Sequence, residues 1–168
     1  SMLEFAALVE EAGFPPGVVN VVTGFGADVG DPLIRHPKIN KVAFTGGEST
    51  GSRIVEASAQ TFKRLTLELG GKSAQIVFAD ADLSSAVSGA VSGIFAATGQ
   101  TCIAGSRLLV HESILKEFTE SFIELARSAR MGDPMLPTTQ VGPVTTRPQY
   151  ERILSYIDIA KNEGAQCL

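Results

Sequence analysis

Apolar residues in the first part of the chain fall into short runs separated by glycine and proline. Residues 3–12 carry most of their apolar side chains on one helical face, and Gly13 with the prolines after it ends that helix. Residues 18–22 are a β-branched run, which predicts a buried strand leading into a glycine-rich turn. Residues 27–35 then predict a short helix.

The same order of elements follows once more. Residues 40–44 predict a strand, residues 45–47 predict a turn, and residues 49–58 predict a helix that opens with small residues. Because strand, turn and helix succeed one another in this way, we expect an α/β fold with a parallel, doubly wound sheet.

Two further strands are predicted over residues 64–69 and 74–78, on either side of a pair of glycines. Gly70 and Gly71 suit a sharp change of direction, and we place a domain boundary at them. This boundary divides the chain into two parts, residues 1–70 and residues 71–168.

Helical periodicity dominates the second part. Residues 82–98 repeat apolar side chains at steps of three and four, with Asp80 or Asp82 available as a cap. Thr146 is the predicted N-cap of the last helix, with Gln149 as its capping-box partner. A loop, a short strand and another amphipathic helix are expected between these two helices, over residues 99–106, 107–111 and 115–130.

Composition and charge exclude several classes of partner. The 168 residues have a net charge of −4 and no stripe of Lys and Arg with interleaved aromatic residues, so we expect no nucleic-acid partner. The N-terminus lacks a basic segment, and the longest weakly apolar run, residues 86–97, is too short to span a bilayer. Cys102 and Cys167 are too few for a disulfide framework and have no metal-ligand spacing with either histidine. We therefore expect a cytoplasmic protein with no membrane partner and no metal site.

Two residues are candidates for chemistry. Cys102 lies in a loop of small residues that leaves space around its sulfur, and a thiol needs only modest activation to act as a nucleophile. The alternative is a buried packing cysteine. Glu68 lies between apolar residues of a predicted strand, where a carboxylate is costly to bury unless it is paired, neutralised or used in a reaction. Its alternative role is an ion pair with Lys72 or Arg64.

Glycine-rich turns supply candidate phosphate contacts. Residues 41–58 have the strand, turn and helix order that directs main-chain N–H groups and a helix dipole at a phosphate. The pattern is not a G-x-G-x-x-G fingerprint, and such turns also serve only to close a βα connection. Residues 24–26 leave the same choice open, between a cofactor-side turn and a simple glycine corner.

Three segments together resemble the aldehyde dehydrogenase superfamily: residues 44–47 (FTGG), 67–73 (LELGGKS) and 99–107 (GQTCIAGSR). Their order and the separation of Glu68 from Cys102 match that family, and the similarity runs through essentially the whole chain. The resemblance implies a three-layer αβα, parallel-sheet architecture that is incomplete here. Residues 1–70 would be the C-terminal part of a Rossmann-like NAD(P)-binding domain, and residues 71–168 the N-terminal part of a catalytic domain.

The resemblance also implies a role for each matching residue. Cys102 would attack an aldehyde to form a thiohemiacetal, a hydride would pass to NAD or NADP, and water activated by Glu68 would hydrolyse the resulting thioester. Gly47 stands where the family frequently has a serine, so main-chain donors would replace a hydroxyl there. Arg107, after the cysteine loop, is expected to be a structural ion-pair partner. The cofactor would contact the residues that match the family's turns, namely Gly26, Thr45, Gly46, Gly47, Leu69 and Gly70.

Full-length members of that family bring further site residues from outside this segment: an oxyanion-hole asparagine, a lysine at the adenine ribose and a glutamate at the nicotinamide ribose. We therefore expect little or no dehydrogenase activity from this chain alone. The resemblance implies an aldehyde substrate and a homodimer or homotetramer. Two alternatives are a catalytically silent nucleotide-binding or assembly fragment, and a CoA-acylating semialdehyde dehydrogenase, in which CoA rather than water accepts the acyl group.

Overall fold

The computed structural model describes residues 1–168 and divides them into two compact units, Ser1–Leu69 and Gly70–Leu168. Each unit contains helices and one pair of parallel strands. The α/β class with parallel strands that the sequence predicts is therefore confirmed. The assignment of the two parts to a cofactor domain and a catalytic domain stays a prediction.

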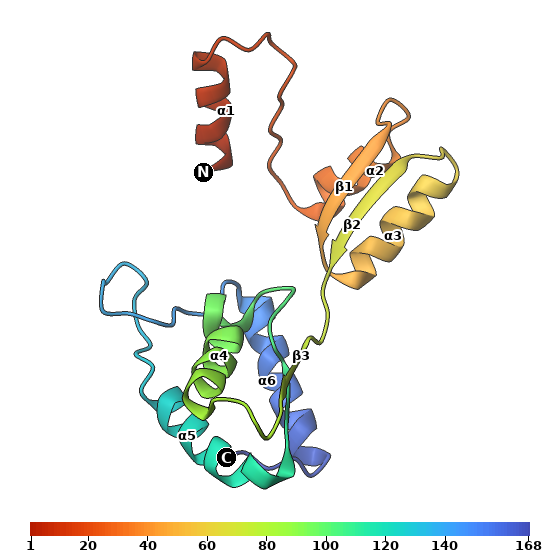
Figure 1. The fold of residues 1–168 in the computed structure, drawn as a ribbon. Helices are drawn as coiled ribbons and strands as arrows, with labels where there is room; N and C mark the ends of the chain where they lie inside the picture. The colour runs from red at the N-terminus through yellow and green to blue at the C-terminus, as the bar shows by residue number, and fades with distance from the viewer. The chain divides into compact units, whose positions relative to one another are not determined.

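The first unit is organised around a βαβ connection. Strand β1 (Lys41–Gly46) leads through helix α3 (Glu48–Ala59) to strand β2 (Arg64–Leu69), and the two strands are parallel, with Lys41 opposite Arg64 and Gly46 opposite Leu69. Figure 1 shows the two strands side by side with α3 lying along them. A helix between parallel strands is the usual crossover in an α/β fold, because the return connection must span the length of the sheet.

Small residues let α3 approach the strands closely. Gly51 and Ile54 on its inner face are buried, and a Cβ atom on Gly51 would lie 2.9 Å from Cδ2 of Leu69 in β2. A larger side chain than glycine there would push the helix off the end of the strand. Ile54, only 2% exposed, is the buried hydrophobic residue of this unit.

The segment before β1 departs in part from the expectation. Helix α1 (Met2–Glu11) is followed by irregular chain, a π-helical turn η1 (Gly26–Gly30) and helix α2 (Asp31–Arg35). The predicted helix over 27–35 is confirmed, but the strand predicted over 18–22 is wrong. A strand needs a partner for its main-chain N–H and C=O groups, and no segment pairs with residues 18–22, whose Val18 and Val22 are exposed.

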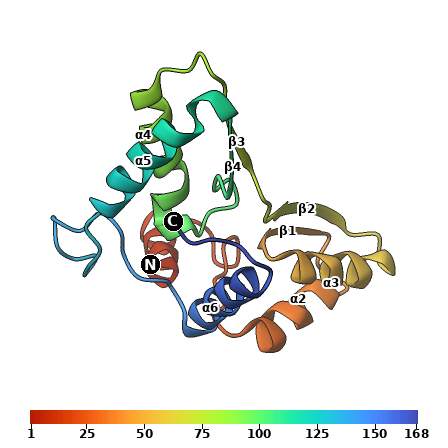
Figure 2. The same cartoon turned by 90° about the horizontal axis from the view of Figure 1, so that it is seen from below.

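The second unit packs two helices against its strand pair. Strands β3 (Ala74–Val77) and β4 (Arg107–Val110) are parallel, with Ala74 opposite Arg107. Helix α4 (Leu83–Phe95) connects them, and α5 (Leu115–Arg127) follows β4 through the short 3₁₀ turn η3 (Glu112–Ile114). Figure 2 shows β3 and β4 side by side, next to α4 and α5.

The core of the second unit lies between these strands and helices. Val77 of β3, Val87 and Ala90 of α4, and Phe118 of α5 form one buried cluster, and Phe118 is only 1% exposed. Phe122 packs on the cluster, with its ring centroid 6.2 Å from that of Phe118. The apolar positions at steps of three and four in both helices are thus the ones that meet, as predicted.

The ends of α4 show one correct and one wrong expectation. Asp82 is the N-cap, because its Oδ1 accepts a hydrogen bond of 2.9 Å from the main-chain N–H of Ser85. The helix was expected to continue to residue 98, but it ends at Phe95. Ala96 leaves the helical conformation with φ −53° and ψ 132°, and the residues assigned to η2 (Ala96–Gly99) include left-handed ones.

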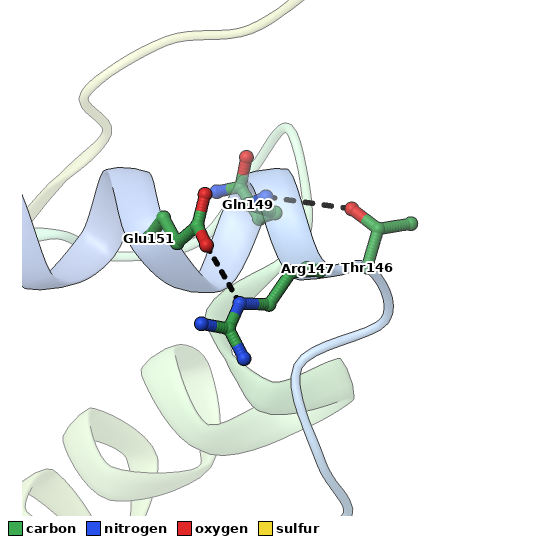
Figure 3. A network of polar contacts seen from close by, with 4 residues as sticks. All are labelled: Thr146, Arg147, Gln149 and Glu151. Atoms are coloured by element: carbon green, nitrogen blue, oxygen red, sulfur yellow. Dashed lines mark hydrogen bonds and ion pairs between the residues drawn. The ribbon is translucent and has the colours of Figure 1, made fainter.

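Helix α6 (Arg147–Asn162) begins at the cap predicted from the sequence. The hydroxyl oxygen of Thr146 accepts a hydrogen bond from the main-chain N–H of Gln149 at 3.4 Å, and Arg147 pairs with Glu151 one turn along at 2.6 Å. Figure 3 shows both contacts. At 16 residues α6 is the longest helix, and none of the helices has the length and apolar character needed to cross a bilayer.

Candidate active site

The parallel register of β1 and β2 brings four predicted site residues together. Thr45 lies opposite Glu68, and Gly46 lies opposite Leu69, at the carboxyl ends of both strands. In open α/β sheets this edge is where ligands bind, because the connecting loops and the helix N-termini converge there. The first unit therefore presents the predicted base and three predicted cofactor residues at one edge.

The turn after β1 is shorter than the sequence indicates. Residues 45–47 were expected to form the turn, but Thr45 and Gly46 belong to the strand, and only Gly47 separates it from α3. The ring of Phe44 packs over Gly46, where a Cβ atom would lie 2.5 Å from its Cζ. Gly46 has no positive φ, so it is not part of a left-handed turn.

Gly47 begins α3 without a side-chain cap. It is the N-cap residue in an extended conformation, with φ −76° and ψ 148°, and no side chain accepts from the first turn of the helix. Its own carbonyl accepts from Thr50 at 3.1 Å and from Gly51 at 3.0 Å. The earlier N–H groups of the first turn therefore remain available to an acceptor, and the helix dipole favours a negative one.

A groove in the first unit adjoins this helix. It has a volume of about 490 Å³ and runs between η1–α2 and α3, with Gly26, Phe44, Thr50 and Arg53 among its lining residues. Asp31 also lines the groove and pairs with Arg35 at 2.7 Å. The hydrogen bond and charge of Asp31 raise the pKa of the Arg35 guanidinium. Arg53, which also lines the groove, forms no ion pair with a carboxylate.

Cys102 lies at the corner of a tight turn in the second unit. The N–H of Ala104 donates to the carbonyl of Thr101 at 3.0 Å, so Cys102 and Ile103 occupy the two central positions. Both Cys102 and Ile103 are exposed, whereas Ala104 is buried. Cys102 is therefore not a buried packing cysteine in this chain.

Left-handed backbone precedes the cysteine turn. Ala97, Thr98 and Gly99 have φ values of 49°, 60° and 70° in succession. A non-glycine residue in this region costs about 1 to 3 kcal/mol and persists only where surrounding contacts impose it. The hydroxyl of Thr98 donates to the carbonyl of Gly142 at 3.4 Å, and the N–H of Gln100 donates to the carbonyl of Ala97 at 3.0 Å.

Further contacts hold the cysteine loop within its unit. The side-chain oxygen of Gln100 accepts from the main-chain N–H of Thr145 at 3.1 Å. On the other side, a Cβ atom on Gly71 would lie 3.9 Å from the carbonyl oxygen of Cys102, so the main chain after Gly70 runs beside the cysteine. The chain has neither a turn nor a bend at Gly70 and Gly71, so the sharp change of direction expected at this pair is wrong.

Two charged residues behave differently from the sequence expectation. Glu68 is exposed and forms no ion pair with Lys72 or Arg64, so neither the burial expected for it nor its structural alternative is present in this chain. Arg107 is structural, but it is not an ion-pair partner. Its Nε donates to the carbonyl oxygen of Lys72 at 2.8 Å, and this contact ties the start of β4 to the chain before β3.

Sequence reasoning missed the residues that shape the cysteine loop. Gln75 of β3 donates to the carbonyl of Gly105, and the left-handed residues Ala97 and Thr98 appeared only as the end of a helix. The alternation of β3 carried one usable signal, because Gln75 shares a face with buried Val77 where an apolar residue is expected. Nothing local in the sequence marks the left-handed conformation of Ala97.

Comparison with known proteins decides the family. The sequence pattern of the aldehyde dehydrogenase family matches residues 1–168, the whole chain. The chain belongs to the aldehyde dehydrogenase family. It is 49% identical over 166 residues to a protein of Arabidopsis thaliana named aminoaldehyde dehydrogenase ALDH10A8, chloroplastic, an alignment that covers 99% of this chain and 33% of that protein.

Solved structures of the family match the fold as well. PnpE from Pseudomonas sp. WBC-3 is 53% identical with a TM-score of 0.94, over 97% of this chain and 34% of that one, and PnpE has also been crystallised with nicotinamide adenine dinucleotide. HpcC from Thermus thermophilus is 42% identical with a TM-score of 0.97, over 99% of this chain and 32% of that one. These matches confirm the aldehyde dehydrogenase type of α/β fold. The chain spans about a third of the length of the relatives it matches.

Proposed function

We propose that this chain supplies the nucleophile, the base and part of the cofactor site of an NAD(P)-dependent enzyme that oxidises aldehydes to carboxylic acids. The observation that carries the proposal is Cys102, an exposed thiol on a tight turn, in a chain whose whole length matches the aldehyde dehydrogenase family. An accessible sulfur held on a turn by main-chain hydrogen bonds suits a nucleophile, because the fixed position lowers the entropic cost of attack.

The first unit fits the cofactor. The uncapped N–H groups at the start of α3 are suitable donors to a pyrophosphate, and Gly47 has open space where a side chain would stand. The adjoining groove of about 490 Å³ includes Gly26, one of the predicted cofactor residues, and can take a nucleoside. Relatives crystallised with the nicotinamide dinucleotide support the same ligand. When bound, the NAD(P)⁺ would accept the hydride.

Cys102 would perform the first covalent step. Its thiolate adds to the aldehyde carbonyl carbon, and the carbonyl oxygen becomes the alkoxide of a thiohemiacetal. Loss of hydride from that carbon restores the C=O bond and leaves a thioester on Cys102. The turn that holds Cys102 keeps the acyl group at one place through both steps.

Glu68 would perform the second step. Its carboxylate takes a proton from water, the resulting hydroxide adds to the thioester carbon, and the C–S bond breaks to release the acid and the Cys102 thiolate. Only Leu69 and Gly70 lie between Glu68 and Gly71, and Gly71 runs beside the main chain of Cys102.

Two substitutions in the intact natural protein test the proposal. Cys102→Ala removes the nucleophile, so NAD(P)H formation from an aldehyde is expected to fall by about 10⁴-fold or more. Glu68→Gln leaves the thiol, so one NAD(P)H per site is expected in a burst, with an acyl group that mass spectrometry finds on Cys102. The matched control is Cys167→Ser, which alters the other exposed thiol and should leave turnover unchanged.

The outcomes separate the candidate functions. Normal turnover in Cys102→Ala would contradict the proposal. Nucleotide binding without turnover in the unmodified protein would favour the silent binding or assembly fragment. Acyl-CoA as the product, in a reaction that depends on added CoA, would favour the CoA-acylating alternative.

Several finer expectations stay predictions. The 168-residue chain alone is expected to show little or no turnover, because it spans a third of the length of its relatives. The identity of the aldehyde, a dimeric or tetrameric assembly and a cytoplasmic location are also predictions. Relatives named chloroplastic and peroxisomal show that location varies within the family.

A further inference from the structure

Gln75 connects the cysteine loop to the helix beside it. Its Nε2 donates to the carbonyl of Gly105, three residues after Cys102, at 3.0 Å, and to the carbonyl of Ala90 in α4 at 3.2 Å. The side-chain NH₂ of glutamine has two N–H bonds, and these two contacts use both of them. A third hydrogen bond also joins the loop to α4: the main-chain N–H of Gly105 donates to the carbonyl of Gly93 at 3.0 Å.

The surroundings of Gln75 leave no room for a side chain on Gly105 and little room for one on Gly93. A Cβ atom on Gly105 would lie 2.5 Å from both Cγ and Cδ of Gln75, and a Cβ atom on Gly93 would lie 3.1 Å from its Oε1. Glycine at both positions lets the amide lie between the loop and the helix. Since Gln75 is half-buried and shares a face of β3 with buried Val77, its polar group replaces apolar packing at this position.

The two hydrogen bonds of the Gln75 amide, called here the Gln75 clamp, lie close to a strained segment. Ala97 and Thr98 hold left-handed conformations just before the turn of Cys102, and such conformations relax unless contacts on both sides impose them. The contact of Thr98 with Gly142 restrains the loop before the cysteine, and Gln75 restrains it after the cysteine.

We propose that Gln75 is a positioning residue, whose amide fixes the main chain of Gly105 against α4 and thereby holds the Cys102 turn in its reactive position. The proposal rests on the function proposed above. Gln75 acts through the loop and touches neither substrate nor cofactor. Loss of its two hydrogen bonds would loosen the loop after Cys102 while β3, β4 and the core cluster stay intact.

The first test replaces Gln75 with methionine, which has similar length and no donor. Gln75→Met is expected to speed hydrogen exchange at the amides of Ala104, Gly105 and Ser106 by about tenfold, because the side-chain link between the loop and α4 is lost with its hydrogen bonds to Gly105 and Ala90. Exchange in the β3–β4 ladder should stay unchanged. The matched control is Gln149→Met, the same change on the exposed surface of this unit.

The second readout is turnover of the intact natural protein. With the loop loosened, kcat is expected to fall about tenfold in Gln75→Met, while KM for the cofactor stays within about twofold, because five of the six proposed cofactor residues lie in the first unit and the sixth, Gly70, lies outside the cysteine loop. A merely structural role would lower the amount of folded enzyme and leave both constants unchanged.

A double-mutant cycle provides an independent test that does not depend on Gln75→Met folding. Gly105→Ala should displace the amide, since its methyl group would overlap Cγ and Cδ of Gln75, and should speed loop exchange as Gln75→Met does. In the Gln75→Ala background that overlap is absent, so Gly105→Ala should add less than about twofold.

The outcomes are decisive. Unchanged hydrogen exchange of the loop amides in Gln75→Met, or additive effects in the double-mutant cycle, would contradict the proposal that Gln75 holds the loop. Faster exchange with unchanged kcat would overturn the positioning role. If the unmodified natural protein has no dehydrogenase activity, the proposed function fails, and the exchange and cycle results alone then decide whether Gln75 holds the loop.

Discussion

Lys63 is a buried cation whose partners are main-chain carbonyls. It is 8% exposed, and its Nζ donates to the carbonyl of His36 at 2.8 Å and to that of Ile39 at 2.9 Å. These bonds join the chain before β1 to the start of β2, at the end of the strand pair opposite to Glu68. Hydrogen bonds from a charged donor are stronger than neutral ones, so Lys63 helps to hold the register of the two strands.

Replacement of Lys63 with methionine should destabilise the first unit. Lys63→Met keeps the length of the side chain but leaves two carbonyls without donors, at an expected cost of about 2 to 3 kcal/mol. Both tyrosines lie in the second unit, so native-state hydrogen exchange in the β1–β2 ladder is the suitable measurement. Lys38→Met, an exposed lysine nearby, is the control, and an equal loss in both variants would contradict the role of Lys63.

Substitution of Ala97, the left-handed alanine before Cys102, is expected to raise stability, whereas Lys63→Met is expected to lower it. Ala97→Gly should stabilise the second unit by about 0.5 to 1 kcal/mol, because relief of the left-handed strain exceeds the added entropy of the unfolded chain. Urea unfolding, monitored by tyrosine fluorescence, measures this change in stability. Ala126→Gly, at a right-handed position in α5, should instead destabilise by about 1 kcal/mol or more. A loss of stability in Ala97→Gly would show that the backbone there is unstrained.

At the scale of elements, helix caps link local sequence to pH dependence. Helices α4 and α6 have the same kind of cap, but Asp82 carries a charge and Thr146 does not. Hydrogen bonding from Ser85, first from its hydroxyl and then from its main-chain N–H, lowers the pKa of Asp82. The folded state therefore binds the ionised carboxylate more favourably than the unfolded state does.

The sign of the resulting pH effect follows directly. Stability from the Asp82 cap is fully present above the unfolded pKa of about 3.9 and is lost as the pH falls through the lower folded pKa. Asp82→Asn keeps a capping oxygen without the titration, so the second unit of this variant should lose less stability between about pH 5 and pH 2. Tyrosine-monitored urea unfolding at a series of pH values measures this difference. An Asp82→Asn profile parallel to the unmodified one would contradict the role of the carboxylate.

At the scale of the whole molecule, the two units have unequal cores. Ile54 is the buried hydrophobic residue of the first unit, whereas the second has six, namely Val77, Val87, Ala90, Ala104, Phe118 and Val141. Burial of a large apolar side chain contributes about 1.5 to 3 kcal/mol, so the second unit has by far the larger hydrophobic stabilisation. The units are therefore expected to unfold at different denaturant concentrations.

Substitutions in each core test this difference. Ile54→Ala should cost about 2 to 5 kcal/mol and abolish hydrogen-exchange protection of the β1–β2 ladder, while the tyrosine-reported midpoint of the second unit stays unchanged. Val87→Ala should lower the denaturant midpoint of the second unit, as reported by tyrosine fluorescence, and leave hydrogen-exchange protection of the β1–β2 ladder unchanged. A shift of both signals by either substitution would show that the units unfold as one.

Local signals in the sequence were sufficient for most elements. The strands β1, β2 and β4 and the helix α3 lie within two residues of the predicted bounds, and the caps Asp82 and Thr146 are the predicted ones. Alternation, helical periodicity and capping depend on neighbours within about four residues, so these features can be recognised in the sequence alone. The motifs around Glu68 and Cys102 likewise identified the family, because they are short and contiguous.

The failures lie where long-range pairing decides the outcome. A β-branched run at 18–22 has strand propensity, but without a partner its main chain stays irregular. The end of α4 at Phe95 and the exposure of Glu68 also depend on tertiary surroundings. The sequence by itself therefore determined the family and which residues are predicted to carry the chemistry. Only the tertiary structure decided how Gln75, 15 residues before Ala90 and 30 before Gly105, holds the cysteine loop, because such contacts follow from the packing of β3 against α4.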